Sequence, residues 1–265
     1  MTEARIDVKI EDRSGIGRMA VVTVSNPKKL NCLNSAQIAA LRQAFEDLAR
    51  DDKLRAVVLT GAGDRAFIGG ADLGELGGLD PAGARLFITR LHKACKAIRD
   101  CPVPVIARVN GFCLGAGLEV AASADFRVAS DSAVFGMPEV QMGLPSVIEA
   151  ALLPGLIGWG KTREILLTGE TFGAAEALAM HFVEKVMPAA SIDAHVTHWL
   201  QLLGSATPAA VRNQKALMNR WQQVSVQEGI YASIDALAEA YGTGEPKAAI
   251  KAFFDAKAKA KRKPA

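Results

Sequence analysis

Apolar residues along the first two thirds of the chain follow two patterns, short continuous runs and stretches with helical spacing. The runs predict buried strands at 19–25, 55–61, 103–109, 124–129, 133–135 and 183–186. The helical spacing predicts helices at 35–50, 81–100 and 115–122. Ser35 is the expected N-cap of the first of these helices. Because strands and helices alternate, we expect an α/β fold with parallel strand pairing.

The pattern changes after about residue 145, where most apolar residues take helical spacing. Helices are predicted at 161–167, 173–180, 192–203, 208–221, 226–241 and 245–257. The chain therefore divides into an α/β part, up to about residue 190, and a helical C-terminal segment.

Composition is that of an ordinary globular protein. Half of the 265 residues are apolar and 22% are charged, which excludes disorder for the bulk of the chain. No uncharged apolar stretch of about 18 residues occurs, so we expect no membrane span. The N-terminus has no apolar run like that of a signal peptide, and the four cysteines form no CxxC motif. We therefore expect a cytoplasmic location.

Charge is unevenly distributed along the chain. From Lys247 onward there are seven basic residues and one acidic residue, Asp255, so this tail carries +6 and residues 1–246 carry −3 of the net +3. The tail can contact an anion such as a phosphate, or it can be a solvated terminus. Because the body is acidic and aromatic residues make up only 6%, we do not expect nucleic acid as a partner.

Two glycine-rich turns, at 66–72 and 110–119, each follow a predicted buried strand. Small residues let a ligand approach the backbone, and a helix that starts there leaves N–H groups without acceptors. Two such turns on neighbouring strands can direct two N–H groups at one oxyanion. Neither turn has a phosphate-binding or dinucleotide-binding motif. Each turn alone is also explained by tight packing.

Two carboxylates belong to the same region. Glu119 lies three residues after Ala116, on the same side of the predicted helix, and in an apolar stretch where a carboxylate needs a partner or a raised pKa. Glu139 follows a short predicted strand. A carboxylate pair suits acid–base chemistry on one water, since one group accepts its proton while the other donates to carbon. Two structurally satisfied glutamates are the alternative.

Three other features carry no predicted chemistry. His195 and His198 are spaced as metal ligands can be, but no third ligand is evident, so no metal site is expected. Cys113 is interpreted as a small core residue. Ser146 has no G-x-S-x-G context, which argues against a nucleophilic serine.

Taken together, the motifs resemble the crotonase (enoyl-CoA hydratase/isomerase) family in order and spacing. They are Asn-Cys-Leu-Asn at 31–34, the two glycine-rich turns, and 135–139, followed by weaker matches at 166–170, 174–177 and 252–257. The resemblance implies a spiral of ββα units followed by helices that form trimers or dimers of trimers. We therefore expect a crotonase-like core with an acyl-CoA site over 1–190 and an oligomerisation segment over 191–265.

The resemblance also implies an activity. The backbone N–H groups of Ala71 and Ala116 would form an oxyanion hole, and Glu119 and Glu139 occupy the positions of the two catalytic glutamates. Having both glutamates favours hydration of a 2-trans-enoyl-CoA to a 3-hydroxyacyl-CoA, or the reverse dehydration. Double-bond isomerisation or another crotonase-type acyl-CoA reaction is the alternative, as is a non-catalytic CoA-binding or RNA-binding homologue.

The implied substrate is a CoA thioester, with no cofactor and no metal. The implied CoA-binding residues are Lys28, Lys29, Leu30, Ala66, Ile68, Gly69, Asp72, Leu73, Phe254 and Lys257. The last two would come from a neighbouring subunit. The implied acyl pocket contains Leu76, Met142, Pro145 and Glu149.

Two positions depart from the family pattern. Ala116 stands where glycine is usual, and residues 143–150 (Gly-Leu-Pro-Ser-Val-Ile-Glu-Ala) replace the glycine-rich segment G-x-x-P-G-x-G-G. The replacement adds a carboxylate, Glu149. This residue either is favoured by a helix dipole or reaches the acyl pocket. The sequence therefore leaves the identity of the substrate's acyl group open.

Overall fold

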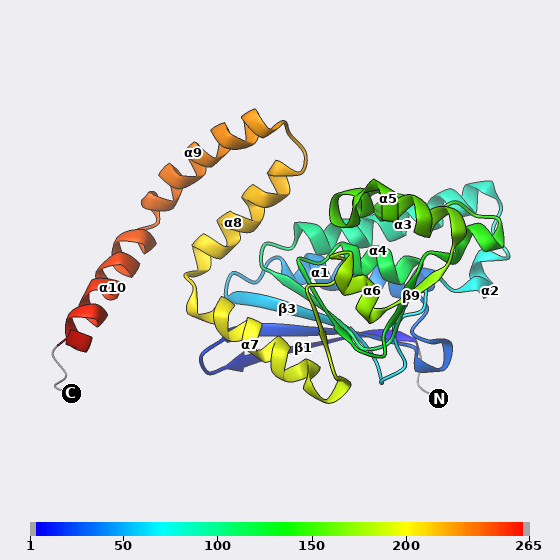
Figure 1. Ribbon diagram of the computed structural model, residues 1–265, viewed down its shortest axis with the longest axis horizontal. Coiled ribbons are helices and arrows are strands. Elements are labelled where there is room, and N and C mark those ends of the chain that lie inside the picture. The colour runs from blue at the N-terminus through cyan, green and yellow to red at the C-terminus, as the bar shows by residue number, and fades with distance from the viewer. Residues whose placement is uncertain (1–3, 262–265) are drawn as a thin grey trace.

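The computed structural model describes residues 4–261 and consists of two sheets, surrounding helices and a helical extension (Figure 1). The strands are β1 (Arg5–Arg13), β2 (Gly17–Ser25), β3 (Leu54–Gly61), β4 (Ala66–Ile68), β5 (Val105–Val109), β6 (Phe112–Leu114), β7 (Phe126–Ser130), β8 (Val134–Gly136), β9 (Thr171–Gly173) and β10 (Lys185–Met187). The α-helices are α1 (Ser35–Leu48), α2 (Leu73–Leu76), α3 (Pro81–Asp100), α4 (Ala116–Ala122), α5 (Leu153–Thr168), α6 (Ala174–Ala179), α7 (Ile192–Ser205), α8 (Pro208–Trp221), α9 (Val226–Gly242) and α10 (Glu245–Lys261). Short 3-10 helices are η1 (Pro27–Lys29), η2 (Pro138–Met142), η3 (Ile148–Leu152) and η4 (Ala189–Ser191).

The order of the strands produces a spiral. The large sheet has the order β1-β2-β3-β5-β7-β10, and the small sheet has the order β4-β6-β8-β9. Strands β3, β5 and β7 of the large sheet are each followed directly by a strand of the small sheet, and β4 and β6 then lead into helices. Pairing is parallel from β2 to β10, as predicted, whereas β1 pairs with β2 in an antiparallel hairpin. These ββα units confirm the predicted fold class.

Local sequence signals explain where the helices begin. Helix α3 starts at Pro81, as predicted, after Asp80, whose side chain accepts a hydrogen bond from the Gly83 N–H. The predicted N-cap of the first helix was wrong by one residue. Asn34 is the cap, and its side chain and that of Gln37 form a reciprocal capping box, while Ser35 is the first helical residue.

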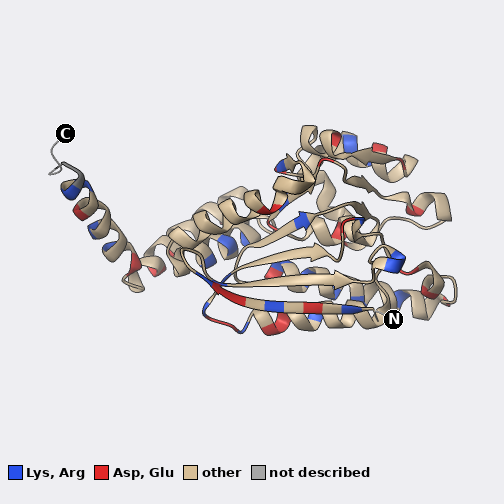
Figure 2. Cartoon of the chain, turned by 90° about the horizontal axis from the view of Figure 1, so that it is seen from below, with Lys and Arg blue, Asp and Glu red and all other residues tan. Residues whose placement is uncertain are grey.

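The edge strand β1 was not predicted from the sequence. Its apolar residues Ile6, Val8 and Ile10 alternate with charged residues, and Val8 and Ile10 are exposed. Figure 2 shows the charged residues along this strand. Charges on an edge strand hinder further pairing with other chains, so the same residues that obscure the strand in the sequence protect the sheet edge.

Both faces of the large sheet are covered. The larger apolar cluster lies between this sheet and the helices that include α1, α3 and α4. The opposite face packs against α7, whose Ile192, Val196 and Leu200 join Met19 and Val58 in a second cluster. Helix α7, the first helix of the predicted C-terminal segment, therefore belongs to the core.

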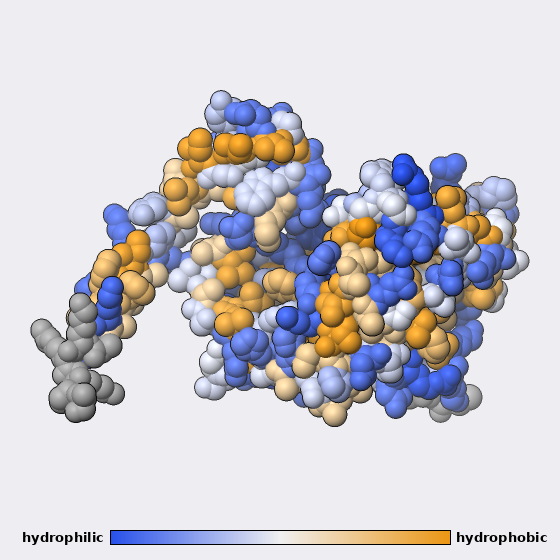
Figure 3. All heavy atoms as spheres, in the orientation of Figure 1, coloured by the Kyte–Doolittle hydropathy of each residue, from blue (hydrophilic) through white to orange (hydrophobic). Residues whose placement is uncertain are grey.

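Helix α8 is held to the body by Lys215, whose ammonium donates to Asp125 and to the Val103 carbonyl, and α9 and α10 form an arm that extends beyond it (Figure 1). Figure 3 shows an apolar band along this arm. The exposed large apolar residues of α9 and α10 are Val226, Ile230, Tyr231, Ile234, Leu237, Tyr241, Ile250, Phe253 and Phe254. Arg262 and Lys263 of the basic tail lie outside the described residues. Among residues 4–261, no helix combines the length and apolar character needed to cross a membrane.

Candidate active site

A cavity of about 710 Å³ lies where the two glycine-rich turns meet α3 and the segment that follows η2. The turns contribute Gly69, Gly70 and Ala71 from the first and Leu114, Gly115 and Ala116 from the second. Helix α3 contributes an apolar wall of Ala84, Phe87, Ile88 and Leu91. A largely apolar cavity with a few convergent polar groups is typical of a small-molecule site.

Glycines allow the two turns to touch. A Cβ at Gly117 would lie 2.0 Å from the carbonyl oxygen of Ile68, so only glycine permits α4 to approach the first turn this closely. Gly115 has a φ of +50°, and a Cβ there would lie 2.4 Å from Oε1 of Glu139. These two positions explain why the second turn is rich in glycine.

The backbone offers two N–H donors to the cavity. Leu33 is bridged to the first turn, because its N–H donates to Gly70 O over 2.9 Å and its carbonyl accepts from Asp72 N over 2.8 Å. In such a parallel bridge the N–H of the intervening residue, Ala71, points to the other side. Ala116 is the first residue of α4, where the N–H has no intrahelical acceptor. Both alanines line the cavity, so their N–H groups are placed to polarise one carbonyl oxygen.

Glu119 faces this cavity from α4 with only 4% of its surface exposed. Its Oε1 accepts a hydrogen bond of 3.3 Å from the Ala150 N–H. Burial, and after it the charge of Glu139, raise the pKa of Glu119 to about 9, although the Ala150 N–H acts in the opposite direction. Glu119 is therefore protonated at neutral pH and can donate a proton.

Glu139 reaches the same cavity from the first turn of η2 and is half-buried. Its Oε2 accepts a hydrogen bond of 2.9 Å from the Ser146 hydroxyl. The structure thus brings the two predicted glutamates to one cavity, beside the two N–H donors. Sequence reasoning missed Ser146. The only available signal was its position in the segment that departs from the family pattern, close to Glu139.

Several other predicted residues also line the cavity. They are Gly69, Leu73, Leu76, Met142 and Pro145. Ala66 and Ile68 are instead buried in β4, the strand that leads directly into Gly69 and Gly70.

The stretch before the first turn is held against it. The Lys29 ammonium forms an ion pair of 2.6 Å with Asp72, and the Leu30 carbonyl accepts from Gly69 N over 2.8 Å. Lys28 lies on the same short helix, η1. Lys29 is thus tied to the first turn, and neither lysine is among the described residues that line the cavity.

Phe254 and Lys257 lie on α10, at the far end of the arm from the cavity of their own chain (Figure 1). Phe254 is 60% exposed. Within one chain, therefore, the structure does not bring these two predicted residues together with the others.

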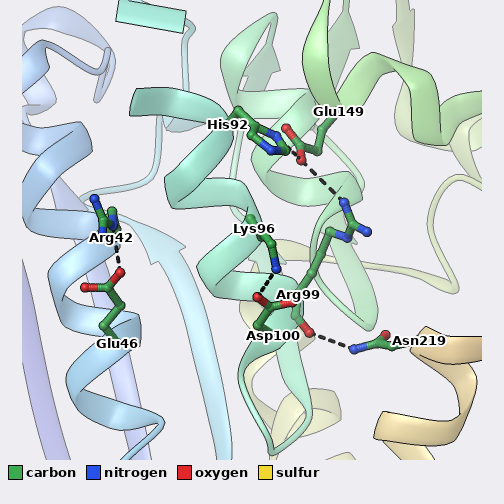
Figure 4. Close-up of polar contacts among 8 residues, drawn as sticks. All are labelled: Arg42, Glu46, His92, Lys96, Arg99, Asp100, Glu149 and Asn219. Carbon is green, nitrogen blue, oxygen red and sulfur yellow. Dashed lines mark hydrogen bonds and ion pairs between the residues drawn. The ribbon is translucent and has the colours of Figure 1, made fainter. Parts of the chain in front are cut away.

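Glu149, predicted for the acyl pocket, is not among the described residues that line the cavity. Its side chain is buried and contacts His92 and Arg99 of α3 (Figure 4). Neither partner is close to Glu149 in the sequence, so no local pattern could have identified them.

The remaining candidates, Cys113, His195 and His198, are not among the described residues that line the cavity. Cys113 is fully buried, and burial raises the pKa of its thiol, which fits the interpretation as a core residue. His195 and His198 lie on α7 with ring centroids 6.0 Å apart. No group of three or more His, Cys, Asp or Glu side chains within the described range 4–261 could hold a metal ion.

Comparison with known proteins places these features in context. Residues 15–263 match the family model described as enoyl-CoA hydratase/isomerase. The short-chain-enoyl-CoA hydratase of Clostridium acetobutylicum is 34% identical over 240 residues, which cover 90% of this chain and 92% of that protein. The crotonyl-CoA hydratase of Syntrophomonas wolfei is 32% identical over 239 residues, covering 90% of this chain and 92% of that protein.

A solved structure gives the same result for the fold. The enoyl-CoA hydratase of Mycobacterium smegmatis superposes with a TM-score of 0.89 at 27% identity, covering 97% of this chain and 98% of that one. The similarity thus extends over the core and the arm alike.

Proposed function

Because the chain belongs to the enoyl-CoA hydratase/isomerase family, we propose that its cavity hydrates a 2-trans-enoyl-CoA to a 3-hydroxyacyl-CoA and catalyses the reverse dehydration. One observation carries this proposal. Glu119 and Glu139 both line the cavity, and Ala71 and Ala116 line it as well. A site for thioester polarisation alone would not need two carboxyl groups.

The chemistry follows from these positions. The thioester carbonyl oxygen binds between the Ala71 and Ala116 N–H groups, which stabilise the enolate that forms as water attacks the β-carbon. Glu139 accepts a proton from the water as its oxygen bonds to that carbon. Glu119, protonated at neutral pH, donates its proton to the α-carbon. The pair thus holds the same number of protons before and after the reaction.

The CoA part of the substrate requires groups outside the cavity. Lys28, on the same short helix as Lys29, supplies positive charge for its phosphates, whereas the charge of Lys29 is already paired with Asp72. Phe254 and Lys257 reach the site of a neighbouring subunit rather than their own. No cofactor enters the reaction, because the thioester itself provides the electron sink.

Oligomerisation explains the exposed apolar side chains of the arm. Helices α9 and α10 expose large apolar side chains, among them Ile230 and Ile234. Exposed apolar patches of this extent mark interaction sites, and a second copy of the chain that packs on them removes them from water. We therefore assign residues 191–265 to oligomerisation, as a trimer or a dimer of trimers, with α7 also serving the core. All four cysteines are free thiols, which fits a cytoplasmic enzyme.

The reaction is tested with two substrates. With crotonyl-CoA, we expect loss of the absorbance of the conjugated thioester and a mass gain of one water in the product. With a 3-enoyl-CoA, an increase of that absorbance without a mass change would instead identify an isomerase. No change in either thioester would contradict an acyl-CoA reaction of this kind.

A further inference from the structure

Glu149 is a buried carboxylate that the proposed reaction does not use directly. It belongs to η3 and has a relative exposure of 2%. Its Oε1 lies 2.9 Å from Nδ1 of His92 and 3.4 Å from Nη1 of Arg99, both on α3 (Figure 4). Its Oε2 has no hydrogen-bond partner within residues 4–261. Burying a carboxylate with one unsatisfied oxygen is costly, so its contacts with His92 and Arg99 must offset that cost.

The backbone beside Glu149 leads to Glu119. The next residue, Ala150, donates its N–H to Oε1 of Glu119 over 3.3 Å. The preceding residue, Ile148, has a φ of +41°. This is a rare conformation for a β-branched residue, and it persists only where neighbouring contacts enforce it. The contacts of Glu149 with α3 supply such an anchor.

The charges around the two carboxyl groups are few. Glu149 is faced by His92, Cys95 and Arg99 from α3 and by Glu119 from α4. Glu119 is faced by Glu139 from η2, by Glu149 from η3 and by Cys95 from α3. The negative charge of Glu149 contributes to the raised pKa of Glu119, less than burial and Glu139 do.

We propose that Glu149 is a positioning residue, held to α3 by His92 and Arg99, which fixes the turn around residue 148 so that the Ala150 N–H stays on Glu119. Glu149 does not line the cavity, so it acts on substrate only through Glu119. Its charge also favours the protonated form of Glu119. The inference rests on the proposed function, since it concerns the proton donor of the hydration.

Glu149→Gln tests this inference, because it removes the charge and keeps the shape. We expect kcat for crotonyl-CoA hydration to fall by about tenfold with KM changed less than twofold. We also expect the alkaline limb of the pH–rate profile, where Glu119 loses its proton, to move to higher pH. The Ala150 N–H lowers the pKa of Glu119 by more than the charge of Glu149 raises it, so losing the anchor raises that pKa. A purely structural defect would lower the rate without moving this limb.

A matched pair of variants on α3 serves as the control. Lys96 pairs with Asp100, whereas Arg99 pairs with Glu149 (Figure 4). Arg99→Met should lower kcat by about threefold, while Lys96→Met leaves it unchanged. Thermal melting shows whether Glu149→Gln folds. If it does not, Arg99→Met and His92→Gln replace it, and both should have a lower kcat than Lys96→Met. Equal kcat values in the three variants would overturn the inference.

Two further results would overturn the inference. One is a Glu149→Gln enzyme with wild-type kcat and pH profile, and the other is a slower enzyme whose alkaline limb has not moved. A wild-type protein that does not hydrate crotonyl-CoA would refute the proposed function itself. That failure is distinct, because it appears before any variant is compared.

Discussion

The hydroxyl of Ser146 donates a hydrogen bond of 2.9 Å to Oε2 of Glu139, and both residues line the cavity. The bond occupies one carboxylate oxygen and fixes the orientation of the other, which lies beside Gly115. Ser146 belongs to the segment that replaces the glycine-rich family pattern. This chain thus supplies a side-chain hydroxyl to support one of its two acidic groups.

Ser146→Ala should lower kcat/KM for crotonyl-CoA by about tenfold, because a hydrogen bond to a charged group is worth about 1.5–3 kcal/mol. The melting temperature should change little, since the residue is partly exposed at the cavity. Steady-state kinetics and a thermal melt check both expectations. Ser205→Ala is the control, because that hydroxyl donates to Leu202 O on α7. Equal rates for the two variants would contradict the role of Ser146.

Glu119 should make the protein less stable as the pH rises. Its folded-state pKa of about 9 lies above the ordinary value of 4.5, so between these pH values the folded state binds more protons than the unfolded state. By linkage, this group's contribution to the free energy of unfolding is present at low pH and declines as the pH rises towards 9.

Glu119→Gln removes that dependence, so its melting temperature should exceed that of the wild type by about 5 °C at pH 8 and by little at pH 4.5. Thermal melts of both proteins across this range give the comparison. A difference that does not grow with pH would argue against a protonated, buried Glu119.

The arm should control assembly. Replacing Ile230 and Ile234 together by Asp places charges in the exposed apolar face of α9, where another copy is expected to pack. Sedimentation should show a trimer or hexamer for the wild type and a smaller species for the variant. Glu239→Gln, at an exposed position on the opposite side of the same helix, should assemble normally. A wild-type monomer would contradict the proposed oligomer.

Strong local signals made much of the fold predictable. Helix α3 combines a capping aspartate, a proline at its start and an apolar face, so its bounds agree with the prediction. Strand β1 lacked such a signal because its apolar residues are spaced among charges. Asn34 and Ser35 are both good caps, and only the capping box with Gln37 distinguishes them.

The site was predictable where it depends on the backbone turns and on residues close in sequence, as with Ala116 and Glu119. It was not predictable where distant elements meet. Glu149 was expected at the acyl pocket, but its partners come from α3, more than fifty residues earlier for His92. Ser146 was considered only as a nucleophile, because its contact with Glu139 depends on how the intervening loop folds.

The most direct test of the account concerns the two glutamates. Glu119→Gln and Glu139→Gln keep the size of the side chain and remove its acid–base function. Each should lower the rate of crotonyl-CoA hydration by at least about 100-fold while circular dichroism shows an intact fold. Glu164→Gln, on the exposed side of α5, should retain the wild-type rate. Rates near that of the wild type in both active-site variants would contradict hydration by a pair of carboxyl groups.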